Sequence, residues 1–491
     1  MMKQRHSPAE TAVTILAAAM VLGSVGLGGA WWGSLLGLQV ALACVVCLWI
    51  KAGGATGRAG LVPYMVALPV LLQVVPLPRL VLAVLAPLPA AAWAEAGRLS
   101  WAPVSVDPAA STAALRWLFL GACTIVAVAH FCTDARCLRR LVTGLAITGA
   151  AICFLAVSSV PFKAERTVGG IVDLRGRIED WRSVTEAPVQ TIGVAYRQRV
   201  AVAGWQYEAD AGVVGMGFGP YVTTNQFAAA LAMCLPAMMA AWLRRDQRFR
   251  PSWSRIGGCV VLAVAAVLIV GPWAQSRAGV IAIGASVAAF LALAAETARG
   301  RLIGGAVTAS LAGVVIVALV IMGGGLGKIA NAGPAALQFV VGSLLHDPRA
   351  VALQAAGAMF SGSPLLGTGL ATYGSLFGRV VPGDVILLYA HNDYAQWLAE
   401  TGCAGWVVAG SFVVSLGRRL HRFMRYTAPG TRLEPAAAWA GLAGIAVHSA
   451  FDWNLHLPAN AVLAMVLVGI AMGSGDRGCV APHGKPPVSR S

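Results

Sequence analysis

Long apolar runs, separated by short polar or basic connections, recur along this chain from one end to the other. Hydrophobic residues make up 58% of the sequence, and charged residues make up only 11%. A helix needs about 20 consecutive apolar residues to cross about 30 Å of hydrocarbon. A chain with this composition and this repetition is therefore predicted to be an all-α polytopic membrane protein.

Charged or turn-forming residues end most of the apolar runs and so define twelve expected membrane spans. They lie near residues 11–30, 34–50, 61–75, 113–131, 141–157, 221–243, 256–273, 278–295, 302–322, 396–416, 435–451 and 457–473. The apolar stretch 80–97 is not counted as a span, because Pro87 and Pro89 would interrupt a helix there.

The formal net charge of +16 raises the question of nucleic acid binding. However, more than half of the 36 Lys and Arg residues lie in short connections that share one side of the membrane if the N-terminus is cytoplasmic. This distribution is what the positive-inside rule predicts. We therefore expect both termini in the cytoplasm and no nucleic acid partner.

This topology gives a single membrane domain, residues 1–475, followed by a disordered cytoplasmic tail, residues 476–491. It places three substantial segments on the opposite, outer face, near residues 76–112, 158–220 and 323–395. Within them, alternating polarity over 191–202 predicts a strand or hairpin, and the pattern over 348–361 predicts an amphipathic helix. The functional surface is expected on this outer face.

Four cationic or titratable side chains stand on or beside the outer face close to predicted helix ends, namely Arg277, Arg349, Arg379 and His391. Arginine offers a planar, permanently charged fork that suits a lipid diphosphate. His391 could take a proton from a hydroxyl group or bind a phosphate oxygen. The alternatives stay open that these arginines snorkel to the membrane surface and that His391 anchors a helix start.

On a helix that starts at His391, Tyr394 would share the face of His391, whereas Asp393 and Glu400 would lie on the opposite face. Both acids would then be poor partners for His391. Glu400 could instead hold a neighbouring helix, and Asp393 could favour the helix N-terminus. The His and carboxylate pairs elsewhere, such as Asp452 with His456, are too sparse for a metal site, so no metal is expected.

The chain also carries short motifs in an order typical of a known family. These are residues 71–78, Ser105, Asp107, Pro108 and Thr112, residues 219–228, Ser276 with Arg277, Arg349, residues 363–369, 391–394 and 400–402, and Phe451 with Asp452. In this order the set resembles the O-antigen ligase and Wzy-type polysaccharide polymerase superfamily of bacterial inner-membrane glycosyltransferases.

The resemblance implies a GT-C-like fold of about twelve helices, with a large periplasmic loop before the helix at the His391 motif. It implies a multi-pass protein of the inner membrane whose active site faces the periplasm. The donor would be an undecaprenyl-diphosphate-linked glycan, and the acceptor would be a second lipid-linked glycan or lipid A-core. Membrane lipids and a chain-length regulator are further expected partners, and no cofactor is expected.

By the same resemblance, site roles fall on particular residues. The catalytic candidates are His391, which would activate the acceptor hydroxyl, and Arg277 and Arg349, which would bind the donor diphosphate; the substrate-binding candidates are Arg379, Asn225, Tyr394 and Asn392. The family often has Asn-His where this chain has Asn225 followed by Gln226.

The sequence thus predicts a metal-independent, inverting glycosyltransferase. A polymerase of O-antigen or exopolysaccharide repeat units is the first expectation, because the motifs at 76–78, at Ser105 to Pro108 and at Asn225 look most like exopolysaccharide members. An O-antigen ligase that uses lipid A-core is the alternative within the same class. A lipid-linked glycan transporter without catalysis is the alternative from another class.

Overall fold

The fold is taken from a computed structural model of the chain, which describes most but not all residues. The described residues are 7–26, 32–54, 62–98, 100–159, 197–202, 205–210, 220–221, 223–244, 253–274, 276–295, 302, 304–306, 309, 313, 348–381, 387–428 and 430–474. The expected span at 302–322 and the tail 476–491 lie largely or wholly outside them.

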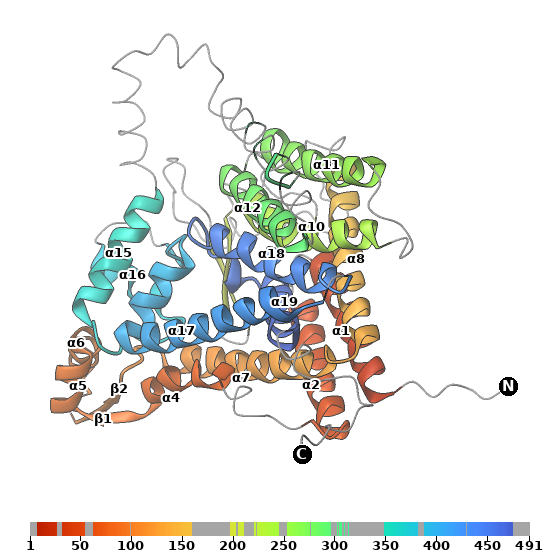
Figure 1. The fold of residues 1–491 in the computed structure, drawn as a ribbon. Helices are drawn as coiled ribbons and strands as arrows, with labels where there is room; N and C mark the ends of the chain where they lie inside the picture. Colours follow the sequence, from red (N-terminus) through yellow and green to blue (C-terminus); the bar gives the residue numbers. More distant parts are fainter. Residues whose placement is uncertain are drawn as a thin grey trace, which may run out of the picture.

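Seven helices of the described chain are long and apolar enough to cross a membrane. They are α1 (Pro8–Val25), α2 (Trp32–Lys51), α7 (Pro108–Phe131), α8 (Ala135–Ser159), α10 (Thr224–Leu243), α12 (Arg277–Ala294) and α17 (Asp393–Tyr426). Shorter helices at expected spans are α11 (Trp253–Leu268), α18 (Leu433–His448) and α19 (Pro458–Ser474). The prediction of an all-α polytopic membrane protein is confirmed (Figure 1).

The expected span at 61–75 differs from the structure. This segment forms two short helices, α3 (Val62–Met65) and α4 (Leu68–Val74), instead of one continuous span. Pro69 lies in the first turn of α4, where its missing N–H cannot continue a preceding helix. The segment is therefore helical, but the prediction that residues 61–75 form one continuous span was wrong.

The stretch 76–103 is a small folded unit and not a span, as we predicted from Pro87. Strand β1 (Pro76–Pro78) is followed by α5 (Arg79–Leu85), α6 (Pro87–Glu95) and strand β2 (Trp101–Pro103), and β1 pairs with β2 in antiparallel register. Figure 1 shows this unit beside α15 (Pro348–Gly362) and α16 (Tyr373–Val380).

Two further elements of the expected outer segments are confirmed. Strands β3 (Arg197–Val202) and β4 (Trp205–Asp210) form an antiparallel hairpin, which overlaps the predicted 191–202 segment. The predicted helix at 348–361 is α15. The irregular helical turns are η5 (Ile269–Trp273), a π-helix that follows α11, and η6 (Asn454–His456), a 3-10 turn before α19.

Helix α10 lies at the centre of the bundle and is the most buried of the long helices. It packs against α8, α12 and α18, and α12 packs against α18 along most of its length. Small residues permit this close approach: a Cβ on Gly441 of α18 would lie 2.7 Å from the carbonyl oxygen of Met233, and one on Gly444 would lie 2.9 Å from Cβ of Ser286.

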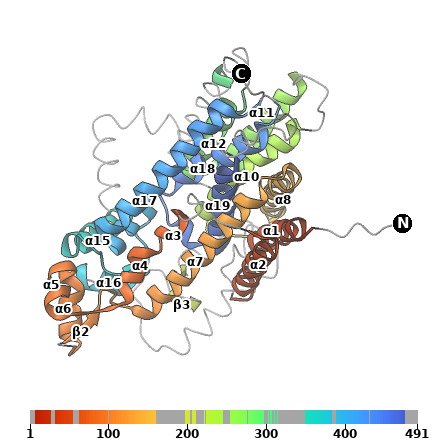
Figure 2. The same cartoon turned by 60° about the horizontal axis from the view of Figure 1, so that its bottom comes forward.

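Several helix ends meet at one end of this bundle, which we call the polar end. It comprises the starts of α10, α12, α17 and α19 and the residues just after α18. Asn225 at the start of α10 bonds to Ser276 before α12, and Asn460 at the start of α19 bonds to the α10 backbone. The amide of Asp393, at the start of α17, donates to Ser449 after α18. Figure 2 shows α17 running from here along the bundle.

Candidate active site

The site is built on a break within α17. Gly402 has φ +62° and ψ −165°, which interrupts the helix, and no Cβ would fit there, because it would lie 2.6 Å from the backbone of Leu365. The backbone groups opened by the break bond to the loop 363–373: the amide of Cys403 donates to the carbonyl oxygen of Pro364, and the amide of Gly369 donates to the carbonyl oxygen of Glu400. Two of the sequence motifs, 363–369 and 400–402, therefore meet as main-chain partners.

Glu400 fastens the same loop through its side chain. Its carboxylate is fully buried and accepts hydrogen bonds from the amides of Ala371 (2.9 Å) and Tyr373 (3.0 Å), at the start of α16. The expectation that Glu400 holds a neighbouring helix is confirmed. Ala371 has a positive φ of 64°, so these bonds stabilise a conformation that a non-glycine residue rarely adopts.

Gln73, from the motif at 71–78, bonds both to the loop 363–373 and to α17. Its buried amide donates to the carbonyl oxygens of Leu366 (2.7 Å) and Glu400 (2.6 Å) and accepts from the amide of Leu370 (3.0 Å). Ser105 continues the scaffold, because its amide donates to the carbonyl oxygen of Gln73. The motifs at 71–78 and 105–108 thus have a structural role: they fix the loop that supports α17.

His391 lies just before α17 and not within it. Its backbone has φ +50°, and the helix begins at Asp393 after Asn392, whose side chain caps the amides of Tyr394 and Ala395. The assumption that the helix starts at His391 was therefore wrong. The positive φ is rare for a residue other than glycine, and the imidazole remains 29% exposed.

The partner of His391 is Asp452, in the connection between α18 and α19. His391 Nδ1 lies 3.2 Å from Asp452 Oδ1, and the carboxylate is almost completely buried. Burial by itself would raise the pKa of Asp452, but the hydrogen bond from His391 and the charges of His391, His448 and Arg349 outweigh it and lower the pKa to about 2. Arg349 therefore belongs to the same electrostatic cluster as His391.

A second pair runs in the opposite direction between the same two segments. His456 Nδ1 lies 3.0 Å from Asp393 Oδ1, so each segment supplies one histidine and one aspartate. Gln396 extends this pair: its Nε2 lies 3.1 Å from His456 Nε2 and donates to Glu400 Oε1, while its Oε1 accepts from the amide of Ala390. Ala390, the residue before His391, is thereby hydrogen-bonded to the buried side chain of Gln396.

Two of the predicted substrate-binding residues anchor the start of α17 to the last turn of α18 and to the residues that follow it. Asn392 Nδ2 donates to the carbonyl oxygen of Ala450 at 2.9 Å, in addition to capping the helix. Tyr394 donates its hydroxyl to the carbonyl oxygen of Ala446 at 2.6 Å, and its side chain is 41% exposed. Contact with substrate remains a prediction for both residues.

Arg277 and Asn225 form a separate group at the start of α12. Arg277 is the exposed first residue of the helix, and Ser276 is its N-cap, with Oγ accepting from the amide of Gly279. Ser276 in turn donates its hydroxyl to Asn225 Oδ1 at 2.6 Å. A π-helix precedes this turn, an irregularity that is frequent at functional sites. Asn225 thus fixes the turn that presents Arg277.

Arg379 lies on α16, apart from the groups around His391 and Arg277. Both its terminal nitrogens donate to the carboxylate of Glu95 on α6, at 2.5 and 2.6 Å. These bonds lower the pKa of the Glu95 carboxyl group. Of the predicted residues, then, the structure joins Arg277 with Asn225 and pairs Arg379 with a residue of α6. Arg349 is related to the pair of His391 and Asp452 by its charge, which helps to lower the pKa of Asp452.

Asp452 is the residue whose site role the sequence did not predict. It lies 61 positions from His391, and its only signal was membership of the motif at Phe451 and Asp452. Within the described residues, no group of three or more His, Cys, Asp or Glu side chains is arranged to hold a metal ion.

The fold and the site define a polytopic helical membrane protein with a histidine and carboxylate pair at the polar end of its bundle. Residues 262–410 match the family of O-antigen ligases, which supports the resemblance to the O-antigen ligase and Wzy-type polymerase superfamily. This region contains Arg277, Arg349, Arg379 and His391 and ends before Asp452. No curated protein matches the chain.

Proposed function

We propose that the protein is an inner-membrane glycosyltransferase that polymerises undecaprenyl-diphosphate-linked repeat units into O-antigen or exopolysaccharide at the periplasmic face. The observation that carries the proposal is the contact of 3.2 Å between His391 and Asp452. His391 lies within residues 262–410, which match the family of O-antigen ligases, as do Arg277 and Arg349. Transfer to lipid A-core is the second candidate, favoured by the name of the matching family.

His391 would act as the general base. If Nδ1 carries the proton and donates it to Asp452, Nε2 keeps a lone pair that can accept the proton of an acceptor hydroxyl. The buried carboxylate would then stabilise the imidazolium that forms. The exposed part of the His391 side chain leaves room for the acceptor to approach.

The acceptor oxygen would attack the anomeric carbon of the donor, opposite the bond to the diphosphate. That bond breaks, its electron pair leaves on the diphosphate, and the configuration at the carbon inverts. The charge that develops on the leaving oxygen needs preorganised cationic groups. Arg277, at the exposed start of α12, and Arg349, whose charge helps to lower the pKa of Asp452, are the proposed groups, and no metal ion takes part in the proposed step.

The proposal is tested by reconstituting the purified protein with a lipid-diphosphate-linked repeat unit, with and without lipid A-core, and following product size on a gel. A ladder from the repeat unit alone supports the polymerase. Product only with lipid A-core identifies a ligase, and no transfer in either case favours a transporter.

Arg277→Ala sharpens this test. We expect it to reduce the transfer rate by roughly 10²-fold, because one stabilising group for the developing charge is lost. Because Arg277 is exposed, the substitution should leave the unfolding temperature unchanged, which thermal unfolding of the purified variant checks. A transfer rate equal to that of the unaltered protein would refute the role of Arg277.

A further inference from the structure

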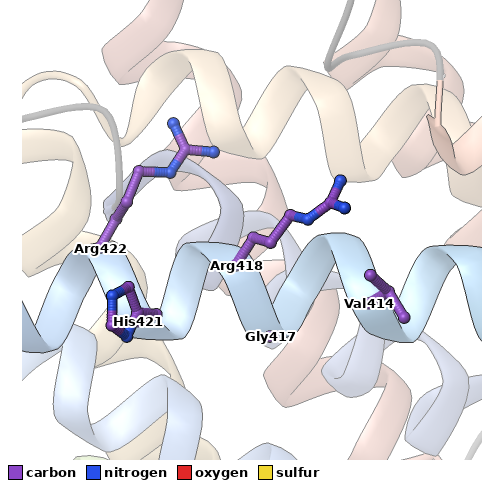
Figure 3. A pocket seen from close by; sticks show the side chains of 5 residues that line it. All are labelled: Val414, Gly417, Arg418, His421 and Arg422. Carbon is purple, nitrogen blue, oxygen red and sulfur yellow. The ribbon is translucent and has the colours of Figure 1, made fainter.

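A basic cavity that is largely open to its surroundings lies on the C-terminal part of α17, beyond the break at Gly402. Its described lining comprises Val414, Gly417, Arg418, His421 and Arg422, and its volume is about 620 Å³. Residues 414, 418 and 422 are one helical turn apart and so follow one stripe of the helix. Figure 3 shows the guanidinium groups of Arg418 and Arg422 extending on the same side of α17.

The cavity lies where an apolar helix surface changes into a basic one. Val407, Val413 and Val414 are 69%, 64% and 53% exposed, as expected for a surface that faces lipid chains. The basic residues begin one turn later, at Arg418. In a membrane helix such a transition marks the level at which hydrocarbon gives way to headgroups.

The neighbouring Arg419 distinguishes a structural arginine from those of the cavity. Arg419 is 3% exposed and donates to the carbonyl oxygen of Met472, which fixes α17 against the end of α19. Arg418, by contrast, is exposed and has no hydrogen-bond or ion-pair partner among the residues that the structure describes. The anchoring function is therefore already fulfilled by Arg419, and Arg418 is available to a ligand.

We propose that this cavity binds the phosphate-bearing headgroup of an anionic phospholipid. Arg418 and Arg422 supply forked donors that match phosphate oxygens, and no acidic side chain is among the described lining residues. The exposed valines one to three turns earlier would contact the acyl chains of the same lipid. A lipid satisfies both surfaces, whereas a free phosphate ion satisfies only the basic one.

The test measures thermal unfolding of the purified, detergent-solubilised protein during titration with phosphatidylglycerol, phosphatidylcholine or inorganic phosphate. We expect phosphatidylglycerol alone to raise the unfolding temperature of the unaltered protein. Arg418→Gln should weaken the apparent affinity roughly fivefold, the effect of about one lost cationic contact. Arg418→Lys keeps the charge but loses the forked donor group. Its apparent affinity for phosphatidylglycerol should lie between those of the unaltered protein and Arg418→Gln.

Arg425→Gln is the matched control, since Arg425 is an exposed arginine of the same helix that is not among the lining residues. It should leave the affinity for phosphatidylglycerol unchanged. Equal weakening by Arg418→Gln and Arg425→Gln would overturn the proposal in favour of a diffuse charge effect. Equal stabilisation by inorganic phosphate would identify a phosphate site, and no stabilisation by phosphatidylglycerol would exclude a lipid site. None of these readouts depends on glycan transfer.

Discussion

The two ends of α17 treat charged side chains in opposite ways. Near its start, Asp393 and Glu400 are buried, and each accepts hydrogen bonds from a neighbouring segment. Near its end, Arg418 and Arg425 are exposed. Burying a charge is costly unless it is paired and hydrogen-bonded, so the first end has one defined geometry. The same helix thus holds buried, hydrogen-bonded carboxylates at one end and exposes Arg418 and Arg425 at the other, where Arg419 is the buried arginine that bonds to α19.

The largest effect is expected from His391→Ala, which removes the proposed base from the buried network. A general base contributes roughly 10² to 10⁴ to a rate, so transfer by the reconstituted protein should fall by at least about 10²-fold. Because the substitution also removes a hydrogen-bond partner of the buried Asp452 carboxylate, the unfolding temperature should fall as well, and rates are compared at a temperature at which both proteins are folded. Initial rates that fall only a few-fold would show that His391 does not remove the proton.

Asp452→Asn should have the next largest effect on transfer, a loss of roughly tenfold or more. The amide can present an N–H group to Nδ1 of His391 and so favour the tautomer whose Nε2 is already protonated. Substrate affinity should change less than the turnover rate, because Asp452 is buried behind the imidazole. A change confined to affinity would argue against this orienting role.

The same variant tests the pH dependence of stability. The pKa of Asp452 is lowered from 3.8 to about 2, so its contribution is complete above about pH 4 and is lost as the pH falls toward 2. The unaltered protein should lose about 2 kcal/mol of unfolding free energy over that interval from this group. Asp452→Asn should lack this part of the acid-induced loss in thermal unfolding measurements.

Glu400→Gln should reduce stability without touching the proposed base. A glutamine can accept through one atom only, so one of the amides of Ala371 and Tyr373 loses its buried acceptor. The expected cost is about 1 to 3 kcal/mol, read from thermal unfolding. Unchanged stability would mean that the loop 363–373 does not depend on this carboxylate.

Glu95→Gln should have the smallest effect on stability, and it provides the exposed counterpart to the buried Glu400→Gln. The pair of Glu95 with Arg379 is exposed, and exposed ion pairs contribute little to stability. No measurable change in unfolding temperature is expected, although the amide removes the same formal charge as in Glu400→Gln. A loss as large as that of Glu400→Gln would show that burial does not decide the outcome.

The sequence predicted the features that depend on local pattern. Apolar runs located most of the long helices, and Pro87 correctly excluded a span at 80–97. The break at Gly402 was not predicted, because it depends on backbone bonds with a loop more than thirty residues earlier in the chain. The assumed helix start at His391 failed for a local reason, since Asn392 caps the helix one residue later.

The candidate site shows the same division. His391 was named from its residue type and position, but its partner Asp452 follows only from the packing of the segment before α17 against the connection after α18. The pairing of Arg379 with Glu95 likewise joins positions 284 residues apart. Residue types thus indicated the chemistry, while the partners that orient them required the tertiary structure.

The crossed pairs of His391 with Asp452 and Asp393 with His456 have a consequence for biosynthesis. The counterparts of His391 and Asp393, namely Asp452 and His456, lie between α18 and α19. They therefore leave the ribosome after α1 to α18 have been made. A chain that ends with α18 carries His391 and Asp393 without either counterpart. The pairs are therefore completed only after the segment that follows α18 has been made, and a chain that lacks this segment has no Asp452 to orient the proposed base.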